Sequence, residues 1–222
     1  MNETQVPHQP QHPKQEFQVE RLAFFSDAVF AIAITLLIIE FRVPVITKDS
    51  TWDSVWEQLV EMKYKLLALC ISFMLIANYW IKHHALFKHI HNYNQRIVIS
   101  NMYILLPVIF FPFSTAFFAE SVENENVMIL GLRLFLLNHI AANITLFVFY
   151  WLTFVYHKDL SYGMERDETL KFRIETLFPM VSFLICLGAT FFTRDMRIFA
   201  GIIIGGLFLK RLTGRFFGVK VR

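Results

Sequence analysis

The sequence is poor in the features on which secreted, nucleic-acid-binding and soluble catalytic proteins depend. Its two cysteines, Cys70 and Cys186, both lie inside apolar runs, so a disulfide framework is not indicated. A formal net charge of only +3 is too small to indicate nucleic-acid binding. The sequence shows no glycine-rich phosphate loop and no Ser/His/Asp or Cys/His constellation. We therefore expect no enzyme, no cofactor and no nucleic-acid partner.

What the sequence has in abundance is apolar residues in long runs. Hydrophobic residues make up 55% of the 222 positions, and 25 of them are phenylalanine. A bilayer core of roughly 30 Å is crossed by a helix of about 20 apolar residues. This composition therefore predicts an all-α membrane protein.

Charged or turn-forming residues divide the apolar sequence into six candidate membrane spans. They are Leu22–Phe41, Leu66–Ile81, Ile97–Ala119, Val127–Tyr156, Ile174–Thr193 and Ile198–Leu212. The sixth has the shortest uncharged core, because Lys210 and Arg211 lie close to its end. We expect a single membrane domain over residues 19–213, a disordered polar tail over 1–18 and a basic tail over 214–222.

The distribution of positive charge predicts which loops face the cytoplasm. With the N-terminus inside, 14 of the 21 Lys and Arg residues fall on the inner side. Cytoplasmic loops are enriched in Lys and Arg, so both termini are expected in the cytoplasm. The absence of a secretory signal and the length of the chain favour a multi-pass protein of the bacterial inner membrane.

The first span carries the unusual chemistry. Asp27 lies more than one helical turn inside an apolar run, where a carboxylate is costly unless it is paired or faces water. Arg21 is not expected to pair with it, since the two side chains point about 120° apart around a helix. Partners are expected on other helices or subunits. The candidates are Asn78, Trp80, His83 and His84 in the second span, and Asn138, His139 and Asn143 in the fourth.

A stripe of the same span follows helical spacing. Ala28, Ile32, Thr35, Leu36 and Ile39 recur at intervals of three and four residues and share one face. From the spacing alone, the stripe is expected to be a packing face of the bundle, and a face with another role is the alternative. Likewise, Asp27 is expected to belong to a packing network, and a direct part in binding ions or protons is the alternative.

The motif Arg21-x-x-x-Phe25-Ser26-Asp27, at the start of the first of six spans, resembles the signature of the transmembrane protein 175 family of potassium channels. Trp80 and the pair His83-His84 near the end of the second span strengthen the resemblance. The span count extends it over the whole chain, although recognisable residues are confined to the first two spans. The sequence also lacks the Thr-Val-Gly-Tyr-Gly filter of ordinary potassium channels, as that family does.

The resemblance implies a tetrameric cation channel. Bacterial members are homotetramers of six-helix subunits, and the first helix of each subunit lines the pore. A large aliphatic residue five positions after the signature aspartate narrows that pore. Here this residue is Ile32, followed on the pore-facing side by Thr35, Leu36 and Ile39.

The family thus implies a role for each residue of the motif. Ile32, Leu36 and Ile39 would form a hydrophobic constriction, and the Thr35 hydroxyl would replace part of the hydration shell of a potassium ion. Arg21, Phe25, Ser26 and Asp27 would form a polar clasp with the second-span residues Trp80, His83 and His84. The expected partners are a lipid bilayer, permeant potassium ions and three further copies of the chain.

Two other classes of function compete with this interpretation. A cation- or proton-coupled secondary transporter would use Asp27, His83, His84 and His139 as a relay. A metal protein would draw on His83, His84, His89 and His91, but none of these pairs has the i, i+4 spacing that directs two imidazoles at one ion. We therefore expect no metal site.

Overall fold

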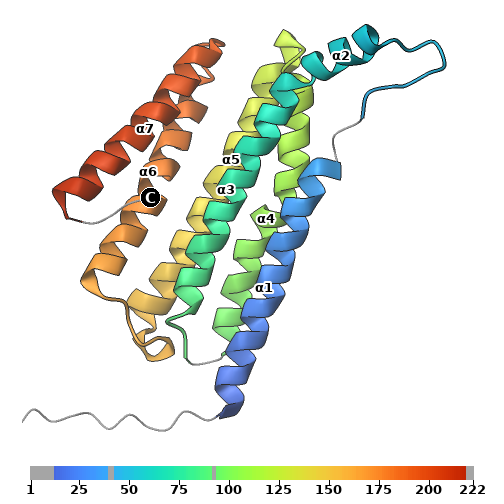
Figure 1. Cartoon of the computed structure of the whole chain (residues 1–222). Coiled ribbons are helices and arrows are strands. Elements are labelled where there is room, and N and C mark those ends of the chain that lie inside the picture. The colour runs from blue at the N-terminus through green and yellow to red at the C-terminus, as the bar shows by residue number, and fades with distance from the viewer. Residues whose placement is uncertain (1–12, 40–42, 92–93, 219–222) are drawn as a thin grey trace, which may run out of the picture.

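The chain folds into helices joined by short connectors (Figure 1). The structure is a computed structural model that describes residues 13–39, 43–91 and 94–218. Within these ranges the α-helices are α1 (Pro13–Ile39), α2 (Trp52–Glu61), α3 (Lys63–Phe87), α4 (Gln95–Ser121), α5 (Glu125–Tyr150), α6 (Arg166–Ala189) and α7 (Met196–Phe216). Helix α5 continues into a π-helical turn, Trp151–Tyr156, and a 3-10 turn, Lys158–Leu160, follows.

Each of the six expected spans coincides with a helix. Five helices, namely α1, α3, α4, α5 with its π-helical turn, and α6, are long and apolar enough to cross a membrane. Helix α7 matches the sixth expected span but carries Arg197, Lys210, Arg211 and Arg215 among its 21 residues. Its apolar part is correspondingly shorter, as the sequence predicted. The all-α membrane fold is confirmed.

Helix α1 begins earlier than the sequence analysis predicted. Residues 13–18, which were assigned to a disordered tail, are helical, and the helix starts at Pro13. Proline is favoured in the first turn of a helix because its fixed φ suits the helix and its missing N–H would have had no partner there. The rest of the expected tail, residues 1–12, lies outside the described residues, as do residues 40–42 at the end of the expected first span.

Helix α2 is an element that the sequence analysis missed. Thr51 and Ser54 form a capping box at its start, and Asp53 lies in its first turn. Trp52 and Trp56 stack on one another with ring centroids 6.4 Å apart, and both are exposed. Gln58 holds the preceding chain against the helix, since its side chain bonds both the N–H and the carbonyl of Val45 at 2.9 and 3.3 Å. A short amphipathic helix therefore follows α1 on the side where α3 begins.

The long helices pack side by side (Figure 1). Helix α1 contacts α3 and α4, α4 contacts α5, and α5 contacts α6, against which α7 lies. A main apolar core fills the space between α1, α3, α4 and α5, with Phe30, Ile76, Phe111 and Phe149 among its most buried side chains. A second core joins α5, α6 and α7 around Phe183 and Phe199. Helix α1 therefore lies at one side of the bundle, and the α6–α7 pair lies at another.

Two connectors at the same end of the bundle are joined through their backbones. The His91 N–H donates to the Leu160 carbonyl at 3.2 Å, and the Tyr162 N–H donates to the His89 carbonyl at 2.9 Å. These bonds flank the isolated bridge between Ile90 and Ser161. They fasten the connector between α3 and α4 to the segment that leads from α5 into α6.

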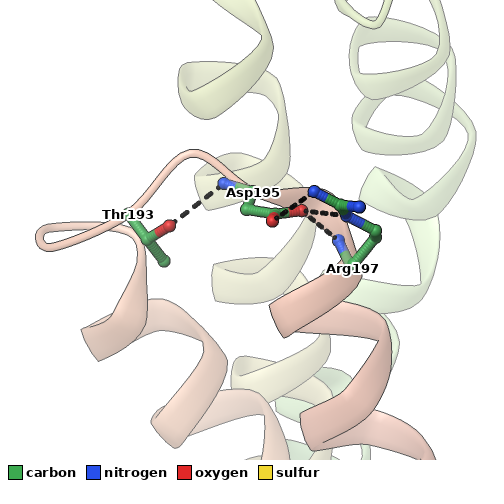
Figure 2. Close-up of polar contacts among 3 residues, drawn as sticks. All are labelled: Thr193, Asp195 and Arg197. Atoms are coloured by element: carbon green, nitrogen blue, oxygen red, sulfur yellow. Dashed lines mark hydrogen bonds and ion pairs between the residues drawn. The ribbon is translucent and has the colours of Figure 1, made fainter.

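The turn between α6 and α7 is fixed by Asp195 (Figure 2). Its carboxylate caps α7 by accepting from the Arg197 N–H at 2.9 Å, and it also accepts from the Arg197 guanidinium at 3.1 Å. The Asp195 N–H donates to Thr193 Oγ1 at 3.1 Å. The hydrogen bonds from Arg197 hold the pKa of the Asp195 carboxyl below its usual value. The cap therefore stays ionised in mildly acidic solution.

Candidate functional site

One side of α1 is packed and the opposite side is open. Its buried stripe consists of Leu22, Ser26, Phe30, Ala33 and Leu37, which recur every three or four residues and face α3 and α4. The other side is exposed in the single subunit. Within the described residues, nothing in the chain covers it.

The predicted pore residues all lie on this open side. Ile32, Leu36 and Ile39 are 58%, 38% and 70% exposed, although each is a large aliphatic side chain. The Thr35 side chain is also exposed, and its hydroxyl donates to the Ile32 carbonyl at 2.9 Å. Because its hydrogen is used in this bond, the Thr35 oxygen keeps lone pairs that can face a cation. The stripe therefore does not pack inside its own subunit.

Asp27 finds its partner on α3. The Trp80 indole Nε1 donates to the Asp27 carboxylate at 2.8 Å, and the Trp80 ring lies 5.7 Å from the ring of His84. A bond to an ionised acceptor is stronger than one between neutral groups. Of the partners suggested by the sequence, Trp80 is thus the one that this geometry joins to Asp27.

Ser26 belongs to a second, fully buried group of contacts. It donates to the Leu22 carbonyl at 2.9 Å and accepts from Asn101 Nδ2 of α4 at 2.8 Å. Asn101 Oδ1 in turn lies 2.8 Å from His83 Nε2, and the His83 ring stacks on Phe87. Ser26, Asn101 and His83 therefore connect α1, α4 and α3. Asn101 was missed in the sequence analysis, although an amide inside an apolar run is a recognised signal of interhelical bonding.

Arg21 and Phe25 do not join these contacts within the subunit. Both side chains are exposed, and the Arg21 guanidinium lies 6.0 Å from the Phe17 ring. The described residues show no ion pair between Arg21 and Asp27, in agreement with their expected angular separation. The motif therefore divides into two inward residues, Ser26 and Asp27, and two outward residues.

The prediction that residues of the fourth span are partners of Asp27 is wrong. The Asn143 amide donates to the Tyr79 hydroxyl at 2.7 Å and to the His139 carbonyl at 2.9 Å. Asn138 donates to the Pro107 carbonyl and to Ser114. None of these residues contacts Asp27, because α5 packs on α4 and α6 whereas α1 packs on α3 and α4. His139 and Asn143 are buried together with Tyr79, whereas the partly buried Asn138 makes its own bonds to α4.

The separation of His139 from Asp27 argues against the transporter alternative. The expected relay through Asp27, His83, His84 and His139 would need a continuous path of hydrogen bonds. Instead His83 bonds to Asn101, while His139 lies among the rings of Phe111, Phe135 and Phe183. The described residues also contain no group of three or more His, Cys, Asp or Glu side chains placed to hold a metal ion.

Comparison with known proteins agrees with the resemblance in the motif. Residues 21–112 match the sequence model of the family described as endosomal/lysosomal potassium channel TMEM175. This region covers the motif, α3 and the first part of α4, including Asn101. The resemblance stated from the sequence is therefore confirmed over this part of the chain.

The relatives are named either potassium channels or, in one case, a proton channel. A potassium channel of Streptomyces collinus is 29% identical over 131 residues, which are 59% of this chain and 62% of that protein. A potassium channel of Chamaesiphon minutus is 36% identical over 106 residues, which are 48% of this chain and 52% of that protein. In zebrafish, an endosomal/lysosomal proton channel TMEM175 is 27% identical over 208 residues, which are 89% of this chain and 39% of that protein. The matches to the bacterial proteins thus span little more than half of their lengths.

Two solved structures share the fold. One is a lysosomal potassium-selective channel TMEM175 homolog from Chamaesiphon minutus, with a TM-score of 0.69 at 23% identity over 86% of this chain and 95% of that one. The other is a variant of the potassium channel MtTMEM175, with a TM-score of 0.60 at 20% identity over 96% of this chain and 98% of that one. The helical architecture is therefore shared over nearly the whole length of both structures.

Proposed function

We propose that this chain is the subunit of a passive potassium channel of the TMEM175 family, in which four copies meet with their α1 helices around a central pore. The observation that carries the proposal is the open stripe on α1. Three large aliphatic side chains are exposed on a helix whose other face is fixed to α3 and α4. An apolar stripe could also face lipid, but a lipid-facing role would not explain why a polar motif fixes the orientation of the helix.

The contacts of the motif set the direction of the stripe. Trp80 bonds to Asp27 from α3, and Asn101 bonds to Ser26 from α4. Two bonds from two different helices oppose rotation of α1 about its axis. Ile32, five residues beyond Asp27, is thereby held toward the open side. The role of Ser26, Asp27, Trp80 and His83 in this proposal is positional, and potassium does not bind to them.

The proposed constriction works by excluding water. Four copies of Ile32 around an axis form an aliphatic ring, and a hydrated ion passes only where the ring is wide enough to stay wet. Leu36 and Ile39 extend the apolar lining, and Thr35 Oγ1 offers an oxygen to a partly dehydrated ion. Such a ring discriminates between cations less sharply than a carbonyl filter does. Potassium moves down its own electrochemical gradient, without covalent chemistry and without a cofactor.

The outward residues of the motif are proposed to act between subunits. Arg21 and Phe25 are exposed on the same side of α1 as Ile32. In a tetramer this side faces neighbouring copies, where Arg21 would meet polar groups of the adjacent subunit. Both termini are proposed to lie in the cytoplasm, because the excess of Lys and Arg on one side favours this orientation. The membrane is proposed to be the bacterial inner membrane.

The test is potassium efflux from liposomes that hold the purified protein. Ile32→Asn should raise the flux and reduce the discrimination between potassium and sodium, because a polar ring stays wet. The matched control is Ile38→Asn, since Ile38 is 55% exposed on the same helix but points about 120° away from Ile32. The control should behave as the parent. If Ile32→Asn and the parent show equal flux and selectivity, Ile32 does not form the constriction.

Two further measurements separate the alternatives. Native mass spectrometry should give four subunits, and a monomer or dimer would contradict the proposed pore. Flux should persist with equal pH on both sides, whereas a proton-coupled transporter would need a pH gradient. Because the zebrafish relative is named a proton channel, proton flux without potassium is measured in the same liposomes.

A further inference from the structure

A groove of about 430 Å³ runs between α4 and α5, away from the open stripe of α1. Its volume lies in the range of roughly 300–1,000 Å³ that is usual for sites of small molecules. Its walls are apolar, formed by Ile99 and Tyr103 of α4 and by Ile144 and Val148 of α5, with Phe149 buried behind them.

The hydroxyl groups along the groove do not make its walls polar. Ser100 Oγ donates to the Arg96 carbonyl, and Thr145 Oγ1 donates to the Ala141 carbonyl at 3.0 Å. Both hydroxyl hydrogens are thus used by the backbone of the helix that carries them. Apart from the hydroxyls of Tyr103 and Thr153, what the groove offers to a ligand along its length is therefore hydrocarbon.

One end of the groove carries a positive charge. Arg96, in the first turn of α4, donates to His157 Nε2 at 2.9 Å, and both residues line the groove. Its partner is a ring nitrogen, and among the described residues no carboxylate lies within ion-pair distance of its guanidinium. The charge at this end is therefore not neutralised by the protein.

The π-helical turn brings His157 to this position. The His157 N–H donates to the Leu152 carbonyl at 2.9 Å, so the wide turn continues to this residue. Trp151 and Tyr156 of the same turn are exposed and lie with ring centroids 5.5 Å apart. Exposed Trp and Tyr side chains are typical of the level of the lipid headgroups. Arg96 thus lies where the apolar part of the bundle meets the interface.

We propose that this groove binds an anionic phospholipid, with one acyl chain along the apolar walls and the phosphate beside Arg96. Charge complementarity selects this occupant, since an apolar groove that ends in an unneutralised guanidinium at the interface matches a chain that ends in a phosphate. In the topology proposed above, this end faces the cytoplasmic leaflet. The site does not depend on ion conduction, and its test does not use flux.

The experiment is native mass spectrometry of the full chain in detergent, titrated with phosphatidylglycerol or with phosphatidylcholine of the same acyl chains. One Arg near a membrane surface contributes about 1 kcal/mol to the binding of an anionic lipid, which corresponds to about a five-fold preference. We expect that preference in the parent and its loss in Arg96→Gln. Arg96→Lys should restore part of it.

Two further variants make the test specific. Arg211→Gln removes another exposed arginine, on α7 and outside the groove, and should leave the preference unchanged. Val148→Trp fills the groove and should weaken binding of both lipids while the melting temperature stays near that of the parent. These two results would attribute the binding to the groove rather than to the positive surface as a whole.

Three outcomes would overturn the proposal. The first is an equal loss of preference in Arg211→Gln, which would mean general attraction to a basic surface. The second is displacement of phosphatidylglycerol by inorganic phosphate alone, which would make the apolar walls irrelevant. The third is a change in the number of subunits in Val148→Trp, which would assign the groove to a second copy of the chain.

Discussion

The indole Nε1 of Trp80 on α3 lies 2.8 Å from the carboxylate of Asp27 on α1. This bond satisfies a carboxylate inside an apolar span, and it links the helix that carries the open stripe to its neighbour. Together with the contact between Asn101 and Ser26, it determines which face of α1 the subunit leaves uncovered.

Trp80→Phe should loosen α1 without removing a ring from α3. The substitution leaves the Asp27 carboxylate without its donor, and a hydrogen bond to a charged group contributes about 1.5–3 kcal/mol. Because both side chains are partly exposed, we expect a loss near 1 kcal/mol in the free energy of unfolding, measured by thermal melting in detergent. Trp151→Phe is the control, since Trp151 is also exposed and, among the residues that the structure describes, its indole donates to no carboxylate. Equal melting of the two variants would contradict the prediction.

Asn101→Leu should affect both stability and conduction. It removes the donor to Ser26 and the partner of His83 Nε2 in a fully buried place, and each buried polar group left unpaired costs about 1–3 kcal/mol. Asn138→Leu is the matched variant, because it breaks bonds between α5 and α4 and does not touch α1. Both variants should melt earlier than the parent. Only Asn101→Leu should alter potassium flux in liposomes, and a similar change in both would argue against a special role for Asn101.

Gly206→Ala should push α7 away from α6, whereas Gly205→Ala should not. A Cβ at position 206 would lie 1.9 Å from Ser182 Oγ and 3.0 Å from Ser182 Cβ, but at position 205 it would meet nothing within 4 Å. Overpacking costs about 1–3 kcal/mol, and the higher helix propensity of alanine returns up to about 1 kcal/mol. Protease digestion of the connector between α6 and α7 should therefore be faster in Gly206→Ala and unchanged or slower in Gly205→Ala.

Acidification should weaken the joined connectors through His91. Partial burial lowers the pKa of His91 below its ordinary value of 6.5, so the folded chain binds the proton less readily than the unfolded chain. The stabilisation from neutral His91 is therefore present above about pH 6.5 and is lost as the pH falls through the lowered pKa. Amide exchange at Tyr162, corrected for the intrinsic rate, should become faster at pH 5.5 than at pH 7.5.

His91→Phe gives the control for this prediction. Phenylalanine keeps a ring beside Tyr162, whose centroid lies 4.5 Å from that of His91, but it does not titrate. The neighbouring pair of His89 and Glu168, 3.4 Å apart, remains in this variant. If the exchange at Tyr162 depends on pH as strongly in His91→Phe as in the parent, His91 is not the responsible group.

Prediction from the sequence succeeded for features that can be recognised within a single helix. The helices at the six expected spans were predicted because apolar runs end at charges, and helical spacing grouped Ile32 with Thr35, Leu36 and Ile39 on one face. That this face is open in the subunit followed from the family resemblance, since spacing alone favoured a packing face. Trp80 was among the partners suggested for Asp27 because it lies in a polar segment of the second span. These inferences need only local periodicity and the cost of a carboxylate in an apolar run.

The sequence predicted poorly where the answer depends on which helices touch. Asn143 and His139 were plausible partners for Asp27 by residue type, but α4 packs between their helix and α1, and it supplies Asn101 instead. Helix α2 was missed because a search for long apolar runs passes over a ten-residue segment in which acids stand beside the tryptophans. The start of α1 at Pro13 was missed because a polar, proline-containing segment has the composition of a tail.

The bonds between the two connectors have a mechanical consequence. The hydrogen bonds of His91 and Tyr162 join the residues directly after α3 to the segment that leads into α6, and α3 is also the helix whose Trp80 bonds to Asp27. The end of α3, and with it the donor to Asp27, is therefore restrained by the segment that precedes α6.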